Sequence, residues 1–337
     1  MQDYANAALL LTNYLVVPGI AYGCQLALGA LGVTLIFSVL RFSNFAHGEL
    51  MSAGTMFAIF ATWGFQAMGL SFGPVPTALV ALPFAILASI AVVLLTDKAI
   101  YRFYRIKRSD PVILLIVSIG VMFVMAGLIR FLIGPDDRTF NDGARFILKA
   151  REVKDYLGLS EGVTIKTSQA ITVLVASIAA GLLFWFLEKT KTGKMMRAFS
   201  DNEDLALLSG INPERIVKLA WVLAAVLATI AGTLYGLDKS YKPFVFQQLL
   251  LPIFAAAIVG GLGNPLGAVI GGFVIAFSEV ALTYAYTKFL AYTLPPAWVP
   301  DGLVQFLPTD YKFAISFVIL VLILLYRPTG ILRGKTL

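Results

Sequence analysis

Residues 41–49 read Arg41-Phe-Ser-Asn-Phe-Ala-His-Gly-Glu49, and this short polar stretch separates two long apolar runs, 23–40 and 50–69. It holds the only histidine of the chain. Ionisable and amide side chains beside a membrane span are costly, so they usually mark a pathway or a contact that needs them. We therefore predict a membrane protein in which the chain is interrupted here for a functional reason.

The composition also predicts a membrane protein. Of 337 residues, 59% are hydrophobic and 13% charged, and the mean hydropathy is +0.85. Since soluble proteins carry about 25% charged residues, this chain could not cover its surface in water. We expect an all-α, polytopic transmembrane helical bundle, a single transmembrane domain over 1–337, with about 8–9 membrane segments and discontinuous helices. The expected segments are 7–40 (with or without an interruption near Pro18-Gly19), 50–69, 75–96, 111–133, 170–187, 216–236, 249–284 and 311–326.

Several other classes of site or signal are excluded or disfavoured. The single cysteine, Cys24, allows no intrachain disulfide and no Cys-based metal site, and one histidine allows no His-based metal site, so we expect no metal. Residues 1–8 carry no basic side chain, so a cleavable signal peptide is not expected. The net charge of +7 is distributed as membrane topology requires, and we expect no nucleic-acid partner.

The distribution of basic residues predicts the orientation, because short loops rich in Lys and Arg stay cytoplasmic. Segment 98–108 and the C-terminal tail carry basic residues and no acid, so both should be cytoplasmic. Loop 134–169 balances six basic residues against six acids, including Asp142, and should be external, whereas loop 188–215 should be cytoplasmic. The basic residues of the first two segments are Lys98, Arg102, Arg105, Lys107, Arg108, Arg327, Arg333 and Lys335. The side of the N-terminus stays open, because 7–40 could be one span or two.

A second break interrupts 249–284, at Gly260-Gly-Leu-Gly-Asn-Pro-Leu-Gly267. The proline cannot donate a backbone hydrogen bond and the glycines cost helix stability. The two breaks can be superposed in sequence, with His47 on Asn264 and Gly54 on Gly271. Discontinuous helices at matching positions of two halves indicate a transport site. The residues predicted to line the pathway are Asn44, Phe45, His47, Gly48, Glu49, Gly260, Gly261, Gly263, Asn264 and Pro265.

Each of these features also has a structural interpretation. The glycines can simply let helices pack closely, which is the interpretation we favour for Gly271 and Gly272. His47 can hydrogen-bond between helices without touching a substrate. Glu279, the other acid of an apolar segment, is expected near the outer membrane interface.

Loop 188–215 contains a short predicted helix. Asp201 or Asn202 can cap it, its first turn is acidic, and Gly210 should end it. Leu205, Leu208 and Ala206 should form its apolar face. Such a helix lies on lipid or docks in a groove of a partner, and the acidic first turn argues against anionic lipid.

Three segments in this order, Asn44-Phe-Ala-His-Gly-Glu49, Ala206-x-x-x-Gly210-Ile211 and 259–268, resemble the permease subunits of branched-chain amino acid ABC importers over about Leu26 to Pro328. The resemblance implies a bacterial inner-membrane importer with a cytoplasmic C-terminus, whose partners are a second permease subunit, two cytoplasmic ATPase subunits and an external solute-binding protein. It also implies a small amino-acid-like substrate. It further implies that the short helix of loop 188–215 docks onto an ATPase subunit and couples ATP hydrolysis to transport. The residues implied in coupling are Asp201, Glu203, Asp204, Leu205, Ala206, Leu208, Gly210 and Ile211. Two features depart from the family pattern, the long charged loop 134–169 and Leu205-Ala206 in place of paired alanines.

The chain itself should not hydrolyse ATP. Gly334-Lys335-Thr336 imitates the end of a phosphate-binding loop. That motif needs four residues between its two glycines, and only three separate Gly330 from Gly334. We therefore expect no enzyme activity and no cofactor in this chain, with ATP bound by the partner subunits. The alternatives are the same class of permease for urea, short amides or other amino acids, and, more distantly, an ion-coupled secondary transporter.

Overall fold

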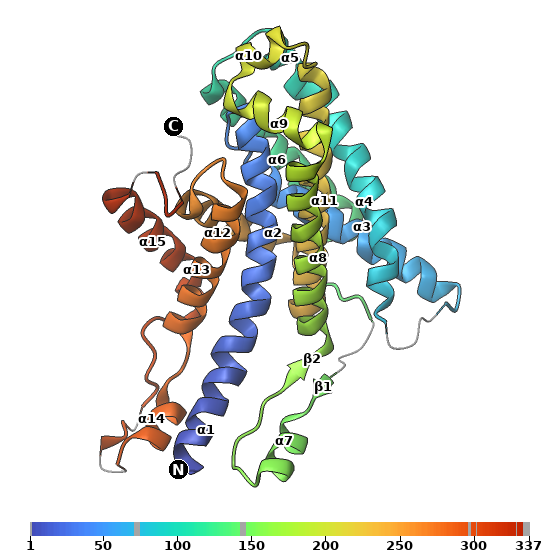
Figure 1. The fold of residues 1–337 in the computed structure, drawn as a ribbon. Coiled ribbons are helices and arrows are strands. Elements are labelled where there is room, and N and C mark those ends of the chain that lie inside the picture. Colours follow the sequence, from blue (N-terminus) through green and yellow to red (C-terminus); the bar gives the residue numbers. More distant parts are fainter. Residues whose placement is uncertain are drawn as a thin grey trace.

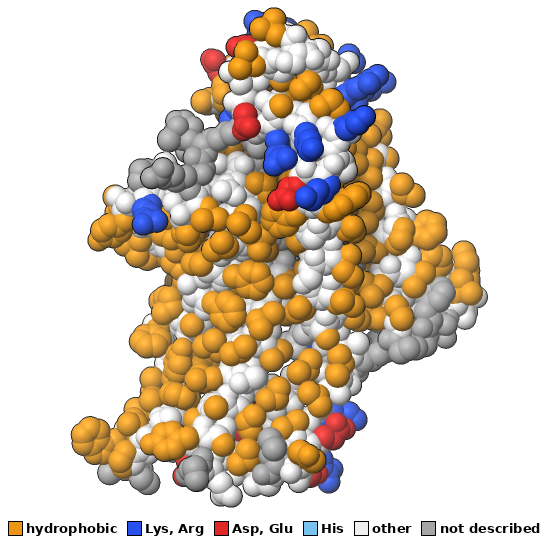
Figure 2. All heavy atoms as spheres, in the orientation of Figure 1, with side chains coloured by type: hydrophobic (Ala, Val, Ile, Leu, Met, Phe, Trp, Pro, Cys, Tyr) orange, Lys and Arg blue, Asp and Glu red, His pale blue; other side chains and the backbone are white. Residues whose placement is uncertain are grey.

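The computed structural model describes residues 2–70, 75–141, 146–295, 298–300, 302–327 and 329–332. Eight helices in this part of the chain are long and apolar enough to cross a membrane, which confirms the predicted polytopic helical bundle. Hydrophobic side chains cover the middle of the molecule, and charged side chains gather at its two ends (Figure 2). Asp142, Arg333 and Lys335, and with them the phosphate-loop imitation at 334–336, lie outside the described residues.

The first membrane segment is one uninterrupted helix of 39 residues, Gln2–Leu40. It consists of α1 (Gln2–Leu11), a π-helical turn η1 (Thr12–Val16) and α2 (Val17–Leu40). The alternative of a break near Pro18-Gly19 is therefore wrong. The wider turn directly before Pro18, in which the Val17 N–H donates to the Thr12 carbonyl, accommodates the missing N–H of the proline without ending the helix. The N-terminus consequently lies at the opposite end of the molecule from α9 and α10 (Figure 1).

The remaining helices follow the predicted apolar runs. The long ones are α3 (His47–Ala67), α4 (Thr77–Thr96), α6 (Pro111–Ile133), α8 (Thr167–Lys189), α11 (Pro213–Lys239), α12 (Pro243–Gly260), α13 (Pro265–Thr283) and α15 (Lys312–Tyr326). Run 50–69 forms α3, which is not among the eight apolar spans and runs obliquely to the side of the bundle (Figure 1). The helix of α4 continues through a π-helical turn η2 (Asp97–Tyr101) into α5 (Arg102–Ile106).

The short elements lie at the two ends of the bundle (Figure 1). One end carries α9 (Lys191–Asp201) and α10 (Glu203–Leu208) together with α5. The other carries α7 (Ala150–Leu157), α14 (Thr287–Thr293) and an antiparallel pair of strands, β1 (Phe146–Leu148) and β2 (Ile165–Lys166). A 3-10 turn, η4 (Thr309–Tyr311), precedes α15. Segments 98–108 and 188–215 thus share one end and loop 134–169 lies at the other, as the charge pattern predicts.

The core is built around α2, which is almost wholly buried, whereas α8 and α15 expose most of their apolar surface. Glycines let α13 approach its neighbours closely. A Cβ on Gly271 would lie 2.0 Å from the Ala256 carbonyl oxygen on α12, and one on Gly272 would lie 2.7 Å from the Ala27 nitrogen on α2. The packing interpretation of these two glycines is therefore confirmed.

Candidate functional site

The first break joins the end of α2 to the start of α3 through a turn that is anchored on three neighbouring elements. Arg41 takes a left-handed backbone conformation, with φ of 56°, and its guanidinium donates to the Ser200 carbonyl on α9. The Asn44 side-chain oxygen accepts from the Tyr101 hydroxyl at 3.1 Å. The Phe45 N–H donates to the Ser118 hydroxyl of α6 at 3.1 Å. The break is thus a fixed structure whose freed backbone groups find protein partners, as the low dielectric requires.

His47 and Glu49 begin α3 in full burial. The His47 ring occupies the space that Gly32 leaves open on α2, since a Cβ on Gly32 would lie 2.6 Å from the ring. The Gly29 carbonyl approaches the ring without hydrogen-bond geometry, so neither ring nitrogen has a partner among the described residues. The predicted interhelical hydrogen bond of His47 is not found there. Glu49 is 1% exposed, and its Oε1 likewise lacks a partner in the described part of the chain.

Close backbone approach fixes α3 against α12. A Cβ on Gly48 would lie 2.7 Å from the Phe246 carbonyl oxygen, so only glycine fits without a shift. The Phe45 ring lies with its centroid 5.2 Å from that of Phe254 on α12. This ring pair links the first break to the helix that leads into the second break. The hydrogen bonds and ring contacts described for the chain do not join the side chains of the two breaks directly.

The second break is a four-residue turn between α12 and α13. Gly261 and Gly263 have φ of +112° and +83°, conformations that favour glycine. The Asn264 side-chain oxygen accepts from the Gly267 N–H at 3.1 Å and so caps α13, which begins at Pro265. A Cβ on Gly260 would lie 2.0 Å from the Gly267 carbonyl oxygen, so the two helices leave the turn in close contact. In this structure Asn264 therefore has a local capping role.

The C-terminal tail closes the second break, a contact that sequence reasoning missed. The Ile331 N–H donates to the Val259 carbonyl at 2.8 Å, and the Leu332 N–H donates to the Gly260 carbonyl at 3.1 Å. These carbonyls belong to the last turn of α12, where helix carbonyls have no intrahelical partner. The tail therefore satisfies groups that the break sets free.

The short helix of loop 188–215 forms as predicted. The Asn202 side chain, not Asp201, caps α10 by accepting from the Leu205 N–H at 3.0 Å. Gly210 has φ of +79° and donates to the Leu207 carbonyl, while the Ile211 N–H donates to the Ala206 carbonyl at 3.0 Å. This pair of bonds is the Schellman arrangement that ends many helices.

The apolar face of α10 is divided between the interior and the surface. Ala206 is 3% exposed and anchors the helix, whereas Leu205 and Leu208 are 61% and 85% exposed. A cavity of about 540 Å³ opens beside the helix, and Glu203, Asp204 and Arg41 are among the residues that line it. The remaining predicted coupling residues, Asp201 and Ile211, flank α10 on its two sides.

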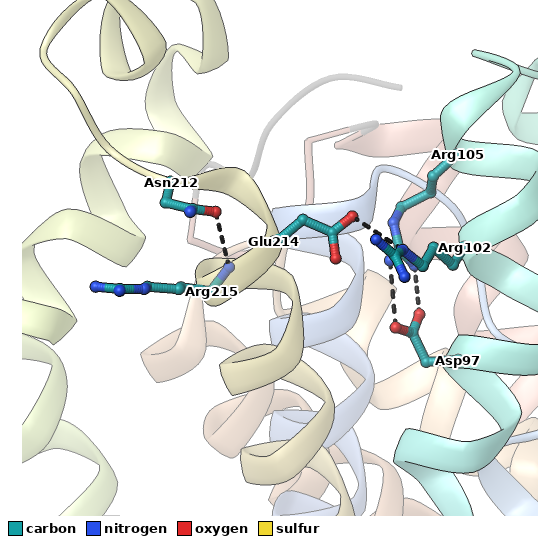
Figure 3. Close-up of polar contacts among 6 residues, drawn as sticks. All are labelled: Asp97, Arg102, Arg105, Asn212, Glu214 and Arg215. Carbon is teal, nitrogen blue, oxygen red and sulfur yellow. Dashed lines mark hydrogen bonds and ion pairs between the residues drawn. The ribbon is translucent and has the colours of Figure 1, made fainter.

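One ion pair joins the start of α11 to α5, and a second fixes α5 against the preceding turn η2 (Figure 3). Glu214 lies 3.6 Å from the Arg102 guanidinium. Arg105 forms a two-point contact with Asp97, with the second hydrogen bond at 3.2 Å. The basic residues of 98–108 served in the sequence only as a signal of orientation, and their contact with Glu214 was not predicted.

Glu279 differs from its expected environment. It lies one turn before the end of α13, as an outer-interface residue would, but its side chain is fully buried. Its carboxylate accepts from the Tyr22 hydroxyl at 2.9 Å and from the Ser316 hydroxyl, and lies 3.5 Å from the Lys312 ammonium. The position near the end of α13 agrees with the expectation, but the burial was not expected, and it arises because α15 folds against α13 and places Lys312 and Ser316 beside Glu279.

Comparison with known proteins identifies relatives over nearly the whole chain. The family model described as branched-chain amino acid transport system / permease component matches residues 15–324. The high-affinity branched-chain amino acid transport system permease protein LivH of Escherichia coli is 30% identical over 319 residues, 93% of each chain. BraD of Pseudomonas aeruginosa is 27% identical over 94% of each chain, and the probable LivH of Methanocaldococcus jannaschii is 29% identical over 93% of this chain and 90% of its own.

Proposed function

The chain belongs to the family of permease components of branched-chain amino acid transport systems, and from this premise we propose that it translocates leucine, isoleucine, valine or a closely related solute. It acts as the membrane-spanning subunit of an ABC importer. The relatives named above carry branched-chain amino acid transport in their descriptions and match 93–94% of the chain. These matches support the substrate class, and the two breaks at the start of α3 and α13 support the location of the pathway.

The observation that carries the coupling part of this proposal is the exposure of α10. Three leucines of α10, Leu205, Leu207 and Leu208, are 61%, 43% and 85% exposed at an end of the molecule where charged side chains gather (Figure 2). An apolar face that lipid does not cover is suited to a groove in another protein. The ATPase subunit supplies that groove, and ATP-driven movement of the ATPases displaces α10.

The proposed assembly places the α9–α10 end and the C-terminus in the cytoplasm and the N-terminus, α7 and α14 outside the bacterial inner membrane. A second permease subunit completes the pathway, two ATPase subunits bind ATP on the cytoplasmic side, and a solute-binding protein delivers substrate from outside. This chain binds no ATP and catalyses no reaction. The acid-free basic segment 98–108 supports the orientation.

Reconstitution tests the function. The chain is co-expressed with its partner subunits, the complex is placed in proteoliposomes, and ATP-dependent uptake of radiolabelled leucine is measured with the binding protein present. We expect leucine, isoleucine and valine to compete with one another, and urea and acetamide to have no effect. Competition by urea or acetamide alone would assign the chain to the same class of importer with a different solute. Uptake that needs an ion gradient and no ATP would overturn the importer function.

A further inference from the structure

A cluster of charged and polar side chains lies where α2, α11, α13 and α15 meet, and it extends from the buried Glu279 outward to the exposed Lys239. It comprises Tyr22, Lys239, Glu279, Lys312 and Ser316. Tyr22 is 18 residues before the end of α2 and Glu279 is 14 residues after the start of α13. At 1.5 Å per residue, these positions are roughly 20–27 Å from the two breaks. The cluster is therefore separate from the site described above.

Both oxygens of the Glu279 carboxylate have partners within the cluster. The carboxylate accepts from Tyr22 and Ser316 and pairs with Lys312 at 3.5 Å. The Lys239 ammonium has no carboxylate within 4.0 Å in the described part of the chain, so it forms no direct ion pair there. Its ammonium lies 4.7 Å from the centre of the Tyr22 ring, against which the Lys312 ammonium also lies, at 3.8 Å.

The two ammonium groups are close enough to act on each other directly. The two positive charges repel each other, and this repulsion is stronger where protein, rather than water, surrounds them. Asp238 attracts the Lys239 ammonium and Lys166 repels it, Asp238 the more strongly, and with both counted the three lysines and two carboxylates still carry one formal positive charge in excess. An oxyanion placed between Lys239 and Lys312 would accept charge-assisted hydrogen bonds from both.

Access to this position comes from the end of the molecule that carries α7 and α14. Lys239 is the last residue of α11 and is exposed, whereas the side chain of Lys312 is 16% exposed and that of Glu279 is completely buried. An anion that approaches from this end therefore meets the two lysines before it meets the carboxylate. Glu279 lies deeper than the two lysines and holds the Lys312 ammonium in place.

We propose that Lys239 and Lys312 form a binding site for the carboxylate of the amino-acid substrate at the outer entrance of the pathway. The inference rests on the proposed function, since it assigns to this site the carboxylate that every candidate amino acid shares. Tyr22 contributes an apolar ring against which both ammonium groups rest, and Glu279 positions Lys312 without contacting the substrate.

Equilibrium binding tests the site apart from transport. The complete complex, without binding protein or ATP, is placed in phosphatidylcholine nanodiscs, and binding of tritiated leucine is measured with leucinamide as competitor. Leucinamide keeps the ammonium of leucine but lacks its carboxylate. Lys239→Met is compared with Lys288→Met, which removes the same charge from an exposed position of α14 at the same end. A lost charge-assisted hydrogen bond corresponds to about 10–100-fold weaker binding.

We expect wild type and Lys288→Met to bind leucine alike, Lys239→Met to bind it at least about tenfold more weakly, and leucinamide to compete poorly. Wild-type affinity in Lys239→Met, equal competition by leucinamide, or no leucine binding by the wild-type complex would each overturn the site. Displacement of leucine by anionic phosphatidylglycerol at a low mole fraction would assign the lysines to lipid phosphate instead. ATP-driven uptake by the same wild-type preparation with binding protein tests the proposed function independently, so the two failures are distinguishable.

Discussion

Gly210→Val tests the coupling role of α10 with little effect on the membrane bundle. Gly210 has φ of +79°, and nothing lies within 4 Å of the position that a Cβ would occupy. The cost of valine is therefore backbone strain, roughly 1–2 kcal/mol for a left-handed L-residue. If the strain also breaks the Gly210 and Ile211 hydrogen bonds to α10, each adds about 1 kcal/mol.

A penalty of about 2–4 kcal/mol is small beside the stability of a folded domain, about 5–15 kcal/mol, but large for one short helix. A helix of six residues is not stable by itself in water, so α10 depends on its caps and on the burial of Ala206. The bundle should therefore insert and assemble while α10 loses its position. Gly210→Asn is the matched control, because asparagine tolerates the left-handed conformation.

The assay uses purified complexes in proteoliposomes and records leucine uptake together with transport-stimulated ATP hydrolysis. Gly210→Val should lower both by about tenfold or more, the factor that corresponds to at least 1.4 kcal/mol, while Gly210→Asn stays near wild type. Binding of the external solute-binding protein should be unchanged. A Gly210→Val complex with normal coupling of ATP hydrolysis to uptake would refute the reasoning.

Leu208→Asp provides a second test of the same surface. Because Leu208 is 85% exposed, its replacement should cost the isolated chain little. In the complex it would place a charge in the apolar groove that α10 is proposed to enter, and the ATPase should co-purify less well or lose coupling. Leu208→Met keeps the apolar contact and should behave as wild type. Equal co-purification and equal coupling of the Asp and Met variants would show that this face of α10 is not the docking surface.

Three further predictions concern the breaks and the orientation. Tyr101→Phe removes the 3.1 Å hydrogen bond to Asn44, about 1 kcal/mol, and should lower the initial uptake rate several-fold with little change in melting temperature; an unchanged rate would remove Asn44 from the pathway. Asn264→Leu removes the cap of α13, about 1 kcal/mol, and should reduce uptake in an assembled complex, whereas Asn264→Asp keeps the capping oxygen and should transport; failure of both would favour an amide contact with substrate. With Cys24 replaced, an impermeant thiol reagent added outside intact cells should label Tyr156→Cys and leave Lys107→Cys unlabelled, and the reverse pattern would invert the orientation.

Local rules explain what the sequence predicted correctly. Hydropathy located the eight membrane segments and was wrong only in counting 50–69 among them, while the cap at Asn202 and the stop at Gly210 follow from preferences that operate within one helical turn. The glycine and proline content of 260–267 likewise placed the turn between α12 and α13. The Pro18 alternative was wrong because a π-helical turn is a local adjustment that hydropathy does not reveal.

Contacts between distant segments account for what the sequence did not predict. Tyr22 and Glu279 are 257 residues apart, and nothing in the sequence around either residue predicts its contact with the other. The tail at Ile331 bonds to Val259 through backbone groups, which carry no side-chain signature at all. A buried acid one turn from a helix end looks, in sequence, like an acid at the membrane interface. Only the fold of α15 against α13 distinguishes the two environments.

The structure provides a continuous set of contacts between α10 and the first break. The chain passes from Gly210 to the start of α11 within three residues, and Glu214 on that first turn pairs with Arg102. Two turns further along α11, the Trp221 ring lies with its centroid 5.0 Å from that of Tyr101, whose hydroxyl donates to Asn44. Since most of α11 beyond its first turn is buried, these contacts offer a physical route by which a displacement of α10 would reach the packing around Tyr101. The same helix ends at Lys239, so the proposed carboxylate site and the coupling loop occupy its two ends.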